Sequence, residues 1–200
     1  MTNKTNIKKT IVTISTINTF IMCFCFTFIN RAYNEQVNLS WLIVYGVTSD
    51  IGTIVANQLF NKHKIKNMIF KYQYILVLCA KVVDLVGIIL YYLTNSLELI
   101  LISDMLVLVL YLLIENIMAE GISVFLSGTE RAKFDRDRNT LRCIGTMVAS
   151  GIAFLISTIF IKNANISKAF VLFLELTYFA VTTPLQILYL KIIREILNKK

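Results

Sequence analysis

The sequence has very few of the residues from which catalytic and metal centres are built. It contains one histidine and one proline among 200 residues, and only 16% of its residues are charged. His63 stands in a lysine-rich segment, outside any His-Glu-x-x-His or Gly-x-Ser-x-Gly motif. The chain also has no Asp-Gly-x-x-Ala-Arg array and no pair of adjacent glutamates. We therefore expect no enzyme, no catalytic residue, no metal and no cofactor.

The four cysteines are too scattered to form a framework. Cys23 and Cys25 share one apolar stretch, Cys79 lies in another, and Cys143 begins a third. Disulfide scaffolds and zinc sites need closely organised cysteines, usually in short polar segments. This spacing favours neither a disulfide framework nor a metal cluster.

Long apolar stretches make up most of the chain, which is 56% hydrophobic and has a mean hydropathy of +0.69. Six of them run over Ile11–Ile29, Trp41–Phe60, Tyr72–Tyr92, Leu97–Met118, Cys143–Ile161 and Ala169–Ile192. Each has about 19 to 24 residues, enough to cross a hydrocarbon core of roughly 30 Å as a helix. Strands are not expected, because backbone groups in lipid must bond within their own helix. The sequence predicts an all-α integral membrane protein, in which residues 1–200 form one bundle of six transmembrane helices.

The basic residues are unevenly divided among the gaps between these stretches. Sixteen fall in the N-terminal tail, after the second and fourth stretches, and at the C-terminus, whereas the other gaps hold only Arg31, Lys162 and Lys168. Because cytoplasmic loops carry the excess of lysine and arginine, both termini are predicted to be cytoplasmic. Basic cytoplasmic segments that contact anionic lipid headgroups account for the net charge of +8, so the charge does not require a nucleic-acid partner. Frequent Ile, Asn and Lys are typical of an AT-rich genome, so we expect a bacterial cytoplasmic membrane.

Several ionisable residues lie inside the apolar stretches. An unpaired charge in lipid costs a few kcal/mol, so each of these residues is a candidate for a binding site until a partner explains it. They are Asp50, Lys81, Asp84, Asp104, Glu115 and Glu175. Counted from the predicted outer ends, most of them and Asn18 fall at similar depths, so carboxylates outnumber the one ammonium there. Such an excess favours a cation or a bound proton. The alternatives are that Lys81 and Asp84 merely neutralise each other, and that Asp104 and Glu175 reach the outer water.

The segment from Ser127 to Arg138 is the most distinctive local sequence. It alternates acids and bases in what we expect to be a cytoplasmic loop, either as an ion-pair network or as a solvated connector. It also resembles the end of helix four in the N-terminal half of major facilitator superfamily transporters, in a branch of drug and metabolite exporters. The matching residues are Ser127, Gly128, Thr129, Glu130, Ala132 and Asp135. The likeness in topology covers essentially all 200 residues, but only this motif is specific.

This resemblance implies a half-transporter, in which helices one, two, four and five line the cavity. We therefore assign substrate and proton binding to Asp50, Asp104, Asn18 and Asn57, and a supporting ion-pair network to Lys81, Asp84 and Glu175. The cytoplasmic gate is expected to consist of Glu130, Asp135 and Arg136, paired with Lys62, Lys64 or Lys66 or with each other. The segment from Ala56 to Lys66 departs from the family pattern, because it lacks the usual Asp and glycines.

These features predict efflux of a cationic or amphipathic small molecule, coupled to protons. Transporters of this superfamily use two six-helix halves around a midplane site, so one half needs a second copy or a second half-transporter. The alternative is a protein that transports nothing, either giving self-immunity to a secreted cationic peptide or serving as an accessory subunit of a membrane complex. The two hypotheses differ in one requirement: a transporter needs Asp50 and Asp104 to move its substrate across the membrane, whereas a non-transporting protein needs them only to bind it.

Overall fold

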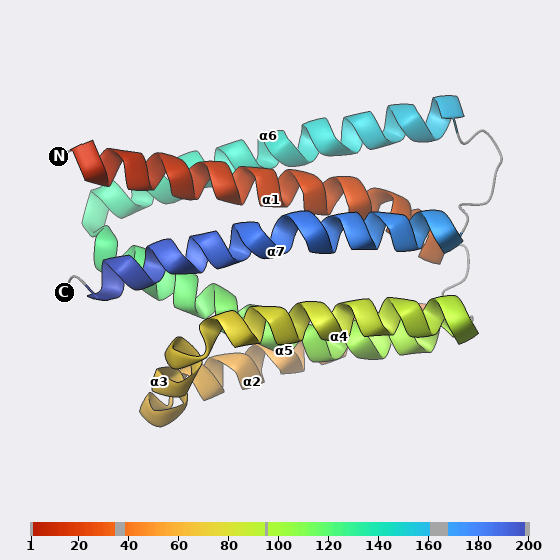
Figure 1. Ribbon diagram of the computed structural model, residues 1–200, viewed down its shortest axis with the longest axis horizontal. Helices are drawn as coiled ribbons and strands as arrows, with labels where there is room; N and C mark the ends of the chain where they lie inside the picture. The colour runs from red at the N-terminus through yellow and green to blue at the C-terminus, as the bar shows by residue number, and fades with distance from the viewer. Residues whose placement is uncertain (1, 35–38, 95, 161–167, 199–200) are drawn as a thin grey trace. The chain divides into compact units, whose positions relative to one another are not determined.

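The computed structural model of the chain is helical throughout the described residues, which are 2–34, 39–94, 96–160 and 168–198; some side chains within these ranges are not described. The seven helices are α1 (Thr2–Asn34), α2 (Leu39–Asn61), α3 (His63–Lys71), α4 (Gln73–Thr94), α5 (Leu97–Phe125), α6 (Gly128–Phe160) and α7 (Lys168–Asn198) (Figure 1). These ranges contain no strand. The predicted all-α class is confirmed.

Five segments within the described residues are long and apolar enough to cross a membrane. They are Lys4–Cys25, Gln73–Thr94, Met105–Phe125, Gly128–Ile156 and Leu172–Asn198. Their length and composition indicate a multi-pass membrane protein. The remaining predicted stretch, Trp41–Phe60, lies within the 23 residues of α2, whose side chains are described only in part. A sixth crossing therefore stays a prediction.

The chain groups into two compact units, and the single six-helix bundle expected from the sequence stays a prediction. Unit 1 consists of Met1–Ala32 and Gly121–Lys200, and unit 2 consists of Tyr33–Glu120. Unit 1 thus combines α1 with α6, α7 and the end of α5, whereas unit 2 combines α2, α3, α4 and most of α5.

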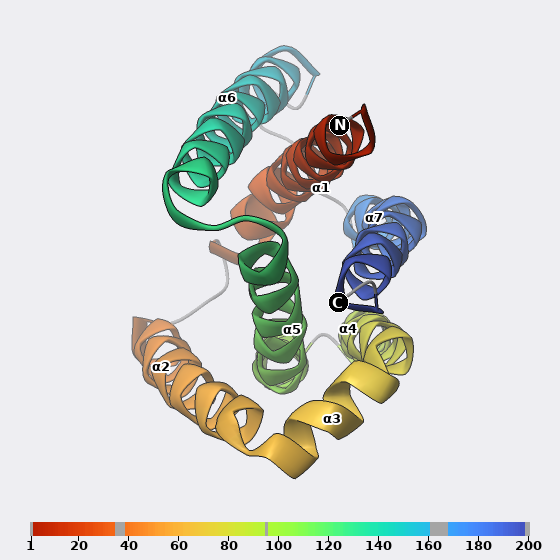
Figure 2. The same ribbon diagram turned by 90° about the vertical axis from the view of Figure 1, so that its left-hand side faces the viewer.

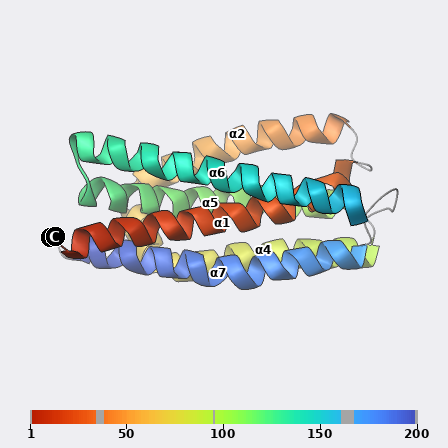
Figure 3. The same cartoon turned by 90° about the horizontal axis from the view of Figure 1, so that it is seen from above.

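In unit 1, α1 and α6 run side by side in the same direction (Figures 1 and 3). Gly145 of α6 allows the close approach, because a Cβ built there would lie 3.4 Å from the Thr16 methyl group. Further along, Cys23 Sγ lies 3.4 Å from Thr146 Oγ1. Phe28 of α1 is 1% exposed, and its ring meets that of Phe170 edge-on at 5.7 Å. The start of α1 and the end of α7 lie at the same end of this unit (Figure 1).

In unit 2, small residues let α5 pack between its neighbours. A Cβ built on Gly52 of α2 would lie 3.5 Å from the side chains of Leu108 and Val109 of α5, and Ala56, one turn later, is fully buried. On the other side, Gly87 of α4 faces Ser103 of α5, and both residues are buried. Close packing through small residues is expected of membrane helices, which gain little from burying apolar surface against one another in lipid.

Two segments expected to be loops are helical. All but the first residue of the charged segment from Ser127 to Arg138 forms the first turns of α6, a single helix of 33 residues that begins at Gly128. Gly128 begins it with φ of +55°, a left-handed conformation that glycine adopts without strain. The basic connection between the second and third stretches contains α3, with nine residues. The two differences have one physical reason. A high charge content does not by itself indicate a loop, because charged residues at i, i+3 and i+4 also stabilise helices.

Candidate functional site

Asp50 lies at the midpoint of α2, eleven residues from each end, and its side chain is exposed. The structure gives it no ion pair or hydrogen bond among the described residues. The same face carries exposed Val47, Ile51 and Ile54, which are 55%, 55% and 57% exposed. An apolar face with a carboxylate at its centre is unsuited to lipid, because an unpaired charge there costs a few kcal/mol. On a helix that crosses a membrane, as predicted for α2, such a face needs a polar or aqueous neighbour.

Asn57, two turns after Asp50, links α2 to α5. Asn116 Nδ2 donates a hydrogen bond to Asn57 Oδ1 over 3.0 Å. Nearby on unit 2, the Lys66 ammonium of α3 lies 2.6 Å from the Glu120 carboxylate of α5. Together these bonds fasten the ends of α2, α3 and α5 to one another. The predicted role of Asn57 in a cavity stays a prediction, because a hydrogen bond to Asn116 also serves simply to hold two helices together.

Lys81 is completely buried in α4, and its ammonium lies 5.3 Å from the centre of the Tyr111 ring of α5. A cation over an aromatic face is stabilised by the ring quadrupole. Asp84, on the next turn, is close enough for the Lys81 charge to act on it. The neutralisation of Lys81 by Asp84 therefore stays a prediction, and the contact with the Tyr111 ring adds to it.

The other predicted carboxylates and Asn18 are separated between the units. Asp104 belongs to α5 of unit 2, but its side chain lies outside the described residues. Glu175 of α7 is 5% exposed and lies near Cys25 of α1, both in unit 1. Asn18 is also in unit 1, and its buried Oδ1 has no hydrogen-bond partner among the described residues. A shared cavity and a network joining Lys81 to Glu175 would span the two units, and both stay predictions.

The two predicted gate carboxylates have ion-pair partners within unit 1. Glu130 pairs with Lys4 at 2.7 Å and also with Lys8, which ties the start of α6 to the start of α1. Asp135 pairs within α6, at 3.6 Å from Arg131 and 3.3 Å from Arg138.

Three further residues of the predicted gate take no part in these pairs. Arg136 is exposed, with its backbone carbonyl accepting a bond from Thr140. Lys62 and Lys64 are exposed in unit 2, and their pairing with α6 stays a prediction.

Sequence reasoning missed one polar contact deep in unit 1. Arg142 Nε donates a hydrogen bond over 3.1 Å to Thr19 Oγ1, and Thr19 is 6% exposed. In the sequence, Arg142 is one of the basic residues between the fourth and fifth apolar stretches. Two features of the sequence could have indicated this contact. Arg142 stands directly before the apolar stretch that begins at Cys143, and Thr19 lies at a matching depth in α1. Among the described residues, no group of three His, Cys, Asp or Glu side chains is placed to hold a metal.

The pairing of Glu130 predicts a pH-dependent link between α1 and α6. Lys4 and Lys8 both donate hydrogen bonds to the Glu130 carboxylate, and these bonds favour its ionised form in the folded protein. A carboxyl whose pKa is lowered on folding adds stability above its unfolded pKa, and that stability is lost as pH falls through the folded pKa. Glu130→Gln should therefore cause a small loss of thermal stability at neutral pH, and this loss should shrink as pH falls below the usual pKa of a glutamate, to about pH 3.

The matched control is Asp137→Asn, on the same helix, because Asp137 is exposed and has no ion pair among the described residues. This variant should melt like the wild type at both pH values. An equal gap between Glu130→Gln and the wild type at both pH values would contradict the assignment.

Comparison of the chain with family models, with curated proteins and with solved structures gave no match in any of the three.

Proposed function

We propose that the chain is a half-size membrane transporter that works as a homodimer or with a second half-transporter, and that it exports cationic or amphipathic small molecules with proton coupling. Six helices would cross a bacterial cytoplasmic membrane, with both termini on the cytoplasmic side. The observation that carries the proposal is the exposed Asp50 carboxylate at the midpoint of α2. The motif from Ser127 to Asp135 adds its resemblance to the N-terminal half of major facilitator transporters.

The exposed face of α2 suits a second copy of this chain better than it suits lipid. Its opposite face is already occupied, since Gly52 and Ala56 pack on α5. In a two-fold symmetric dimer the same patch meets itself, so residues near the axis face their own copies. Apolar contact by Val47, Ile51 and Ile54 would surround two Asp50 carboxylates. Two carboxylates at close range cannot both be ionised, so they would hold a proton between them or bind a cation.

The test is transport by purified protein in vesicles, with tetraphenylphosphonium as the probe cation and a pH-sensitive dye in the lumen. In vesicles with the wild-type protein, an imposed gradient of the probe cation should drive protons across the membrane in the opposite direction. Asp50→Asn keeps the side-chain shape but cannot release a proton, so its rate should fall to that of protein-free vesicles. Asp137→Asn, a matched change in the charged start of α6, should transport at the wild-type rate.

The proposal fails if Asp50→Asn moves protons as fast as the wild type, because the carboxylate would then have no part in coupling. It also fails if the wild type binds the probe cation but moves neither the cation nor protons. That second result would favour the non-transporting alternatives, self-immunity to a secreted cationic peptide or an accessory role in a membrane complex.

A further inference from the structure

Helix α3 crosses the ends of its neighbours instead of running along them. It connects the end of α2 to the start of α4, and its axis lies across both (Figure 2). The 22 residues of α4 form one of the five candidate membrane spans. A helix that lies across the end of a span runs close to the plane of the membrane surface.

The inner side of α3 is fixed to the rest of unit 2. Ile69 is 3% exposed, and Phe70 packs against Phe60 of α2 with ring centres 6.1 Å apart. Lys66 pairs with Glu120 of α5 and also lies 5.5 Å from the centre of the Phe60 ring. These contacts fix the rotation of α3, so its other side faces outward in a defined orientation.

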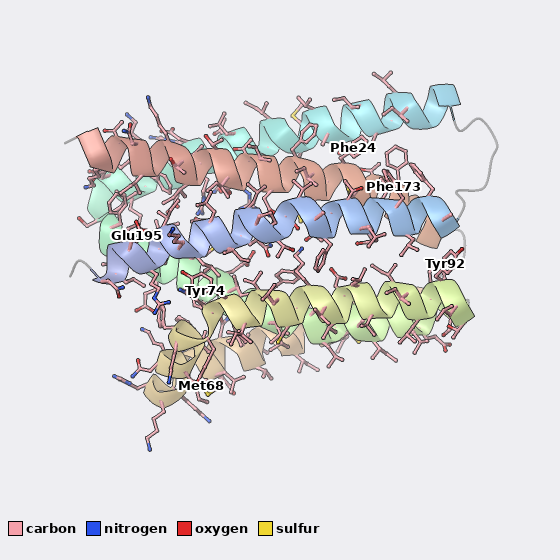
Figure 4. All side chains as sticks on the ribbon, in the orientation of Figure 1. Phe24, Met68, Tyr74, Tyr92, Phe173 and Glu195 are labelled. Carbon is pink, nitrogen blue, oxygen red and sulfur yellow. The ribbon has the colours of Figure 1, made fainter. Side chains whose placement is uncertain are left out.

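The outer side of α3 changes gradually from apolar to polar around the helix. At one edge Met68 and Tyr72 are 55% and 43% exposed, large fractions for apolar side chains (Figure 4 marks Met68). Next to them are the exposed Lys64 and Lys71, two turns apart on one face, with the Lys71 ammonium 5.2 Å from the centre of the Tyr72 ring.

The far edge of this outer side is polar. There Asn67 Nδ2 lies 3.0 Å from His63 Nδ1, and both residues are exposed. Apolar side chains beside lysines, with an amide and an imidazole beyond, match the order of acyl chains, phosphates and water at a bilayer surface.

We propose that the outer side of α3 binds the phosphate groups of anionic lipids in the leaflet that it faces. Met68 and Tyr72 enter the boundary between acyl chains and headgroups, while Lys64 and Lys71 contact phosphates. Apolar side chains alone would not distinguish anionic from zwitterionic lipid, but the two lysines do. The proposal depends on membrane insertion and not on transport, so it stands or falls separately from the proposed function.

The first test measures depth with tryptophan. In a Trp41→Phe background, Met68→Trp and Asn67→Trp place the only tryptophan of the chain on two edges of α3. In vesicles of phosphatidylcholine and phosphatidylglycerol, the tryptophan at position 68 should be quenched by brominated lipid and the one at position 67 by aqueous acrylamide. Quenching of both by acrylamide alone would place α3 in water and overturn the proposal.

The second test measures lipid choice by native mass spectrometry of protein released from mixed phosphatidylcholine and phosphatidylglycerol nanodiscs. Lys64→Gln/Lys71→Gln should lower the affinity for phosphatidylglycerol by about thirtyfold, the effect of two lysines at a membrane surface. The control, Lys133→Gln/Arg136→Gln, removes two exposed charges from α6 and should change retention little. Equal losses in both variants would show a general effect of net charge, and no loss in either would show no lipid binding by α3; each overturns the proposal.

Discussion

Gly87→Ala should destabilise the protein by about 3 kcal/mol, the upper end of the cost of overpacking a buried contact. A Cβ built on Gly87 would lie 2.5 Å from Ser103 Cβ, and nearer still to the Ser103 hydroxyl. A hydroxyl can rotate away, but a Cβ is fixed to its backbone, so α4 and α5 must move apart. The gain in helix propensity from alanine, about 1 kcal/mol, is too small to offset this. Unfolding by SDS in mixed micelles, followed by circular dichroism, measures the loss.

A double-mutant cycle assigns this loss to one contact. Ser103→Gly removes the Cβ that an alanine at position 87 would meet, so Gly87→Ala/Ser103→Gly should recover most of the stability. The control is Gly151→Ala in α6, because a Cβ built there has nothing within 4 Å. It should leave stability unchanged or slightly raised. If the double variant is no more stable than Gly87→Ala, the contact between α4 and α5 is not the cause.

Gly121→Ala should cost about 2 kcal/mol, by the same mechanism in unit 1. A Cβ built on Gly121 of α5 would lie 3.0 Å from Ile193 Cδ1 and 3.3 Å from Ile193 Cβ, with Cγ2 closer than either. Ile193 of α7 is completely buried, so its side chain can make room for the new methyl group only by a small rotation. The cost is lower than at position 87 because a rotatable side chain takes part of the strain. The same SDS titration measures it.

The cycle for this pair uses Ile193→Ala, which alone should cost about 2 to 4 kcal/mol through the cavity that it leaves. In Gly121→Ala/Ile193→Ala the new methyl group occupies part of that cavity. The double variant should therefore be more stable than the sum of the two single losses predicts. Simple additivity would show that Gly121 and Ile193 do not meet.

The sequence predicted the helical class and most of the spans because hydrophobic length is a local property. A run of some 20 apolar residues forms a helix in lipid whichever neighbours it later meets. By contrast, the high charge content of the start of α6 and of α3 favoured loops at both places, although both are helical. In α3 the spacing of Ile65, Met68, Ile69 and Tyr72 matches an amphipathic helix and could have revealed it.

Partners across helices could not be predicted, because they depend on helix rotation and on which helices are neighbours. Gly87 and Gly151 look alike in the sequence, yet one meets a serine of another helix and the other meets nothing. Likewise, the charge of Glu130 gave no preference between the lysines near position 64 and Lys4 of the N-terminal tail. In a chain where nearly every position is apolar, periodicity does not show which face is buried.

The central claim is that the exposed face of α2, with Asp50 at its centre, is covered by a second copy of the chain. The most direct test is the mass of the purified protein in lipid nanodiscs, determined by native mass spectrometry at a protein density close to that in the membrane. We expect a particle that contains two copies. A particle with a single copy would contradict self-association and would remove the second Asp50 carboxylate on which the proposed proton or cation binding depends.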